Sequence, residues 1–216
     1  MKLASKMFAL TALSVACSAA SAQQTAPLTV TGNITPPACT ASMSNDGAFK
    51  YSDIDAVSLS DANTGTVLPA SPAATFNISC LGASQVAWAI VDNRSDSPYF
   101  TSDTGMFGLG KDKDGNKIGS YLVRMNQPTL DGANAYAMRS SDGGKTWAYL
   151  ERNGYVMRPG TNLYTYSKTG NWNSLDKGSV FSASMLVYPT IAPKGTLNTS
   201  DEIDLDGSTT INLSYL

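Results

Sequence analysis

Alternating apolar and polar positions recur along the chain and predict a series of short strands. In one of them Phe76, Ile78 and Cys80 fall on the same face, with polar or small residues between them. The predicted strands are residues 28–34, 74–81, 86–91, 120–125, 180–188 and 210–216. Beyond residue 22 no segment carries apolar residues at helical spacing over three turns. The pattern therefore predicts an all-β protein.

Turn-forming pairs separate these runs. Asp-Gly or Asn-Gly pairs, which tolerate the positive φ of tight turns, begin at residues 46, 114, 131, 142, 153 and 206. Many short strands separated by such turns indicate a β-sandwich or barrel. Residues 94–175 hold seven of the ten Tyr and two of the three Trp. We expect this region to form long hairpins or loops inserted into a sandwich, with its aromatic side chains in a small second core.

The first 22 residues have the layout of a secretory signal. Lys2 and Lys6 precede an apolar run of about ten residues, which is shorter than the roughly 20 needed to cross a bilayer. Small residues follow, and we expect cleavage after Ala22. The alternative is a lipoprotein signal with Cys17 as the lipidated residue.

The charge balance and the residue types narrow the functions to consider. The chain has 15 Lys and Arg, 17 Asp and Glu and no His, for a net charge of −2. No basic patch favours nucleic acid or anionic lipid as a partner. Without His, the usual catalytic triads and His-based metal sites are excluded. We expect a protein that is not an enzyme and that needs no cofactor or metal.

Two cysteines remain after the signal, Cys39 and Cys80, 41 positions apart. An even pair in an exported chain favours one disulfide, and the alternative is two buried thiols. Two cysteines without His would make a poor zinc site.

Several acidic motifs favour structural roles. Residues 140–147 match the Ser-x-Asp-x-Gly-x-Thr-Trp turn of sialidases, where the turn is structural, and it occurs once. A propeller needs several blades, so we predict a rigid hairpin here. Residues 111–116 resemble a calcium loop but lack the distal Glu, which favours a solvated turn. Two pairs of acidic residues, Asp53 with Asp55 and Asp204 with Asp206, leave a glycoside hydrolase as a remote alternative.

A more specific resemblance combines the two ends of the chain. Gly32 lies in the apolar row of residues 28–34, Cys39 follows seven residues later, and Tyr215 is the penultimate residue. This arrangement resembles the subunits of chaperone–usher pili. The chain departs from them at Ile203, where pilins usually carry a Gly, and Gly207 is the nearest one. Residues 107–110, 118–121 and 141–147 also resemble a secreted, fimbria-like bacterial family known mainly as a domain of unknown function.

The resemblance implies an immunoglobulin-like sandwich that lacks its last strand. Residues 36–216 would form this domain, with the insertion at about 94–175, and residues 23–35 would form an N-terminal arm. The arm would complete a neighbouring subunit through Leu28, Val30, Gly32 and Ile34. The strand that accepts it would present Ile211, Leu213 and Tyr215.

The implied partners are a periplasmic chaperone, an outer-membrane usher and neighbouring subunits, with the periplasm and then the cell surface as locations. The main alternative is that the arm pairs within its own domain, which gives a self-complete secreted module for a glycan or protein ligand. The candidate ligand-binding aromatics of that module are Trp147, Tyr149, Tyr155, Tyr164, Tyr166 and Trp172.

Overall fold

The structure is a computed structural model, and it describes residues 29–33, 38–150 and 154–216. By their internal contacts the residues divide into two units, Met1–Thr35 and Pro36–Leu216. All the strands of the described residues lie in the second unit. The predicted signal peptide falls outside the described residues. Within the described ranges no helix is long and apolar enough to cross a bilayer.

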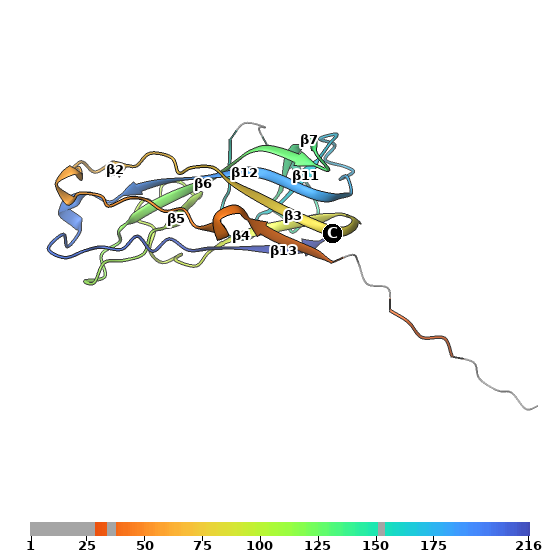
Figure 1. The fold of residues 1–216 in the computed structure, drawn as a ribbon, viewed down its shortest axis with the longest axis horizontal. Coiled ribbons are helices and arrows are strands. Elements are labelled where there is room, and N and C mark those ends of the chain that lie inside the picture. Colours follow the sequence, from red (N-terminus) through yellow and green to blue (C-terminus); the bar gives the residue numbers. More distant parts are fainter. Residues whose placement is uncertain (1–28, 34–37, 151–153) are drawn as a thin grey trace, which may run out of the picture. The chain divides into compact units, whose positions relative to one another are not determined.

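The larger of two antiparallel sheets has eight strands in the path β1-β3-β12-β6-β10, with β2 beside β12 and β5 and β7 beside β6 (Figure 1). Its strands are β1 (Cys39–Met43), β2 (Thr66–Val67), β3 (Ala74–Ser84), β5 (Met106–Gly108), β6 (Gly119–Leu130), β7 (Ala133–Asn134), β10 (Tyr155–Val156) and β12 (Gly178–Ile191). We call it the first sheet.

The second sheet has five strands in the order β13-β4-β11-β8-β9. They are β4 (Val86–Asp92), β8 (Tyr136–Ser140), β9 (Ala148–Tyr149), β11 (Leu163–Ser167) and β13 (Thr209–Tyr215). Three short 3-10 turns complete the described elements: η1 (Ser44–Gly47), η2 (Ala56–Ser58) and η3 (Lys194–Thr196). The predicted all-β sandwich is thereby confirmed.

Aromatic side chains from both sheets fill the core between them. The Trp88 ring on β4 packs edge-on against Tyr166 on β11, with the ring centres 4.7 Å apart, and lies 5.5 Å from Phe76 on β3. All three side chains are buried. On β3 and β12 buried residues alternate with exposed or partly buried ones, as expected of strands with one face on the core.

The region of the predicted insertion, residues 94–175, contributes strands to both sheets. These residues supply β5 to β11, and β6 is the central neighbour of β12 in the first sheet. Four Tyr residues of this region pack into the core between the sheets: Tyr121 on β6, Tyr155 on β10, and Tyr164 and Tyr166 on β11.

The Asp-Gly pairs behave differently from one another. Asp131 and Gly132 have φ of 51° and 78° and join β6 to β7 in a tight hairpin, as predicted. Asp206-Gly207 forms no such turn and lies in an extended segment that leads into β13. A Cβ at Gly207 would lie 2.9 Å from the Tyr121 ring, so close packing explains this glycine.

The predicted disulfide between Cys39 and Cys80 is present. It joins β1 to β3 at directly opposed positions of the ladder. Because β1 has β3 as its one ladder neighbour among the described strands, the bond fixes the edge of the first sheet.

Candidate functional site

The chain leaves the first sheet at a left-handed turn after β1. Asn45, Asp46 and Gly47 have φ of 56°, 51° and 73°, a conformation that Asn, Asp and Gly tolerate better than other residues. Beyond the turn, the backbone of residues 49–54 makes no hydrogen bond to any other described strand. We call residues 48–54 the strap.

The opposite wall is the edge strand β13. Its backbone bonds to the rest of the second sheet come from even-numbered positions: Asn93 N donates to Ser208 O, and Leu216 N donates to Gln85 O, both at 3.0 Å. Backbone groups of successive residues point to opposite edges of a strand. The odd-numbered residues from 205 to 215 therefore direct their N–H and C=O groups to the outer edge, where no described strand pairs with them.

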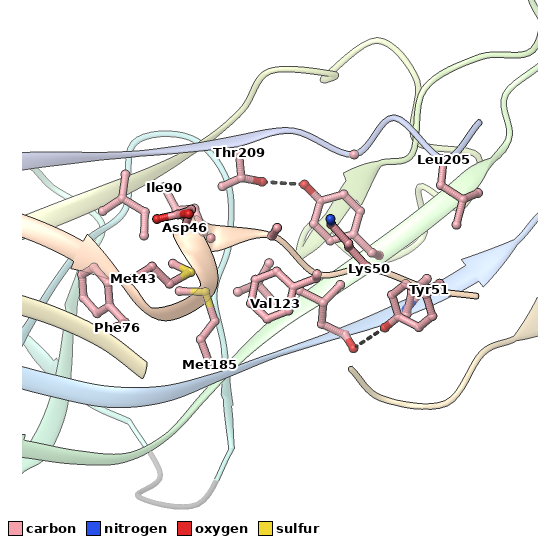
Figure 2. A pocket seen from close by; sticks show the side chains of 18 of the residues that line it. Met43, Asp46, Lys50, Tyr51, Phe76, Ile90, Val123, Met185, Leu205 and Thr209 are labelled. Atoms are coloured by element: carbon pink, nitrogen blue, oxygen red, sulfur yellow. Dashed lines mark hydrogen bonds between the residues drawn. The ribbon is translucent and has the colours of Figure 1, made fainter. Parts of the chain in front are cut away.

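A cavity of about 530 Å³ lies between the strap and this free edge, and we call it chamber 1 (Figure 2). Buried side chains of both sheets form its floor, among them Phe76, Ile90, Val123 and Met185. Its apolar floor and unpaired strand edge are the two features that an added β-strand would require.

A second cavity of about 550 Å³, chamber 2, continues along the same course. The two chambers share four lining residues, Phe49, Lys50 and Tyr51 of the strap and Leu205 of the opposite wall. The chambers thus form one groove that narrows where these side chains approach each other.

Polar contacts hold the walls of the groove in place. Tyr51 Oη donates to Val187 O at 3.1 Å, and Tyr121 Oη shares a hydrogen bond of 2.5 Å with Thr209 Oγ1 (Figure 2). Burial raises the pKa of Tyr51 and raises that of Tyr121 to about 12, so both hydroxyls stay protonated.

An ion pair fixes the segment that precedes β13. Arg94 donates from Nε and a terminal nitrogen to the two carboxylate oxygens of Asp206, at 2.7 and 2.9 Å. The hydrogen bond from Arg94 is the main reason why the pKa of Asp206 lies below its usual value. Asp206 N also donates to Leu109 O. The Asp206 carboxylate therefore has a structural role.

The predicted residues of the C-terminal strand have different positions. Ile211 lines chamber 1, whereas Leu213 and Tyr215 do not. Leu213 packs against the core, and Tyr215 Oη accepts a hydrogen bond of 2.8 Å from Cys39 N. The link between β13 and β1 closes the groove at its disulfide end.

Two of the four predicted arm residues can be described. Residues 29–33 form no strand, Val30 is 88% exposed, and a Cβ placed on Gly32 would have no atom within 4 Å. Leu28 and Ile34 lie outside the described residues.

The six candidate ligand-binding aromatics do not form one surface. Tyr155, Tyr164 and Tyr166 are buried in the core, where the Tyr155 and Tyr166 hydroxyls share a hydrogen bond of 3.0 Å. The rings of these three residues are packed in the core, and the Tyr164 hydroxyl accepts a hydrogen bond from Arg158 N. Trp147 is half-buried, while Tyr149 and Trp172 are exposed.

The Asp142 turn is held by its own side chains. Asp142 Oδ1 accepts hydrogen bonds from Thr146 N at 2.9 Å and Ser140 Oγ at 2.7 Å, and Oδ2 accepts one from Thr146 Oγ1 at 2.6 Å. Trp147 Nε1 donates to Gly144 O. With every carboxylate oxygen engaged in the hairpin between β8 and β9, Asp142 has the structural role predicted for this motif.

We expect Asp142→Ala to loosen this hairpin and to change the near-ultraviolet circular dichroism of Trp147. The pKa of Asp142 lies well below its usual value, mainly because the carboxylate accepts hydrogen bonds from Thr146. The carboxylate therefore stabilises the turn above about pH 4 and loses this effect as the pH falls further. Ser141→Ala, at an exposed neighbour, should leave the spectrum unchanged. An unchanged spectrum in Asp142→Ala would contradict the assignment.

Two more acidic residues of the motifs, Asp112 and Asp55, also serve local structure. Asp112 accepts bonds from the backbone of Asp114, Asn116 and Asn198, and the bond from Asn198 is the main cause that lowers its pKa to about 2. Asp55 accepts a bond from Val57 N at the start of η2. Among the described residues no cluster of His, Cys, Asp and Glu has the arrangement of a metal site.

The groove walls include residues that the sequence did not single out. Phe49 and Tyr51 alternate on the strap, and Ile203 and Leu205 alternate before β13. The sequence signal that could have indicated this wall is the apolar–polar–apolar alternation at residues 203–205, which continues the pattern of residues 210–216.

Two comparisons with known proteins found a family of unknown function and an uncharacterized relative. Residues 28–106 match the family described as "Protein of unknown function (DUF1120)". The chain is also similar to "Uncharacterized protein YhcF" of Escherichia coli (strain K12), at 24% identity over 208 residues. That similarity covers 83% of this chain and 85% of the relative.

Proposed function

We propose that this protein is a structural subunit of a bacterial surface fibre, in which a strand from a neighbouring copy fills the groove. One observation carries the proposal: the free edge of β13 runs beside an apolar groove that opens onto the core. Unpaired edges of this kind invite pairing with another chain. A groove with this structure supports a role in assembly and not in catalysis.

The chain's own N-terminal arm is suited to fill such a groove. Residues 23–35 carry no charged side chain, and their apolar positions alternate at Leu28, Val30 and Ile34. At about 3.3 Å per residue, these positions would follow roughly 20 Å of the groove. In a neighbouring copy the arm would pair with the outer edge of β13 and turn its apolar side chains to the floor, as in other strand additions.

The same groove explains why such a subunit would need assembly proteins. An open edge above an exposed core aggregates unless another strand covers it. We therefore propose that a periplasmic chaperone protects the groove after export and that an outer-membrane usher directs the exchange for the next subunit's arm.

The experiment compares periplasmic extracts of chains with and without residues 23–35 by size-exclusion chromatography. We expect the full chain to run as polymers or bound to a chaperone. The truncated chain should be chaperone-bound or aggregated but never polymeric. If both chains run as free, stable monomers, the proposal is wrong.

A single substitution offers a sharper test of the arm. Gly32→Leu should abolish polymers while leaving the subunit folded, because a large side chain would enter the groove where Gly32 presents none. The space around Gly32 in the free chain is open, so the change should not disturb folding. Thr31→Leu adds similar bulk to the opposite face of the arm and should still polymerise. Normal fibres from Gly32→Leu would overturn the donor role of the arm.

A ligand-binding role is the second candidate, and the exposure of Trp172 and Tyr149 favours it. Trp172 is 60% exposed, and an aromatic ring at a surface can stack on a sugar or on an apolar protein side chain. Binding of a monomer to a glycan array, lost in Trp172→Ala, would support this candidate.

A further inference from the structure

The two chambers of the groove differ in charge. Chamber 2 has an apolar floor that includes Ile118 and Ile191, which are 1% and 3% exposed. Its rim is acidic. The charged residues that line it are Asp53 on the strap side, Asp201, Glu202 and Asp204 on the opposite side, and Lys50 where the chambers meet. Four carboxylates thus face one ammonium group.

Most of this negative charge is not neutralised within the subunit. Asp201 pairs with Lys113, but no ion pair involves Asp53, Glu202 or Asp204 among the described residues. The side chains of Ile203 and Leu205 pack toward the core, while those of Glu202 and Asp204, which alternate with them, are exposed. The carboxylates therefore border the groove without blocking its floor.

The arm of a neighbouring copy would leave this rim without a counter-charge. Residues 23–35 contain Gln, Thr, Asn, Pro and apolar residues and no Lys or Arg. A strand without basic side chains that lies between these carboxylates would partly desolvate them without offering a compensating charge. The acidic rim would therefore be better complemented by an occupant that, unlike the arm, carries Lys or Arg side chains.

We infer that chamber 2 is a docking site for a basic, extended segment of a second protein that holds the subunit during assembly. The apolar residues of this segment would reach the floor formed by Ile118 and Ile191, and its Lys or Arg side chains would face Asp53, Glu202 and Asp204. This inference rests on the proposed function, because it assumes that the groove takes a strand. It adds that charge distinguishes the assembly partner from the subunit's own arm.

The test measures binding of fluorescent peptides by anisotropy to the full mature chain carrying Gly32→Leu, which should stay folded without filling the groove of a neighbour. The first peptide has the sequence of residues 23–35. The others carry two added lysines before Gln23 or after Thr35, or two added glutamates at the same places. In low salt, one of the two lysine peptides should bind about tenfold more tightly than the arm peptide, and the glutamate peptides should bind more weakly. The advantage should largely disappear at 0.5 M salt because the rim is exposed to solvent.

Substitutions assign the effect to the rim. Glu202→Gln with Asp204→Asn should abolish the advantage of the lysine peptide and leave the affinity of the arm peptide unchanged. The control, Asp61→Asn with Asp96→Asn, changes the net charge equally at exposed residues that line neither chamber, and it should retain most of the advantage.

The outcomes separate this inference from the proposed function. If the arm peptide binds but neither lysine peptide binds more tightly, or if the advantage survives in the rim variant, the inference is wrong and the strand-binding groove stands. If no peptide binds, both are overturned.

Discussion

A chain that carries a second copy of residues 23–35 after Leu216 should be a stable monomer. β13 ends beside Cys39 at the closed end of the groove, so a short turn after Leu216 would start a new strand antiparallel to β13. Its Leu, Val and Ile side chains would be buried in the groove. Each contributes roughly 1.5–3 kcal/mol on burial, so we expect the free energy of unfolding to rise by about 5 kcal/mol. Urea unfolding followed by Trp fluorescence would measure the change.

The matched control changes the apolar face of the added copy and nothing else. With asparagine in place of the residues that correspond to Val30 and Ile34, the added strand should bring little stability, and the chain should again polymerise or aggregate. Equal unfolding midpoints for the two fusions would show that the groove does not bind the arm, because the added length and turn are the same in both.

The strands at the two sides of the core could be predicted from the sequence because one face of each packs against the core. β3 alternates between buried Phe76 and Ile78 and exposed Thr75 and Ser79. Predicted residues 180–188 lie within β12, and residues 210–216 correspond closely to β13. In these strands the alternation of apolar and polar residues indicates which side chains pack against the core. The prediction of these strands is confirmed.

β11, in the middle region, could not be predicted because two of its buried residues are polar. In β11, Thr165 and Ser167 are as buried as their neighbours Tyr164 and Tyr166. Thr165 Oγ1 donates to Val86 O at 2.7 Å, and Ser167 Oγ donates to Asp176 at 2.8 Å. Only the folded structure supplies these partners, so the sequence resembled a polar loop.

The groove is hidden in the sequence for a different reason. Its walls are extended segments without a ladder partner, and Phe49, Ile203 and Leu205 are only partly buried. Such segments have neither the long alternation of a strand nor the polarity of a loop. The resemblance to pilins pointed to the C-terminal edge, whereas the strap opposite it became visible only from the arrangement of the chain after the turn at residues 45–47.

Removal of the disulfide should be the most destabilising change outside the aromatic core. Cys39 and Cys80 are 41 positions apart, and opening a loop of this length costs about 4 kcal/mol through the entropy of the unfolded chain. We expect Cys39→Ala with Cys80→Ala to lower the melting temperature by about 10 °C. Reduction of the parent chain with dithiothreitol should produce the same shift, and no further shift in the double variant.

The disulfide should also matter for the groove, because it holds the strand to which β13 is tied. Tyr215→Phe removes the bond from Cys39 N to Tyr215 Oη but keeps the disulfide, and it should cost about 1 kcal/mol. If β1 is held mainly by the disulfide, the double cysteine variant should lose both stability and assembly, while Tyr215→Phe should still assemble. If Tyr215→Phe alone prevents assembly, the closed end of the groove depends on this hydrogen bond and the disulfide is secondary. Unfolding curves and size-exclusion profiles of the two variants, measured together, distinguish these cases.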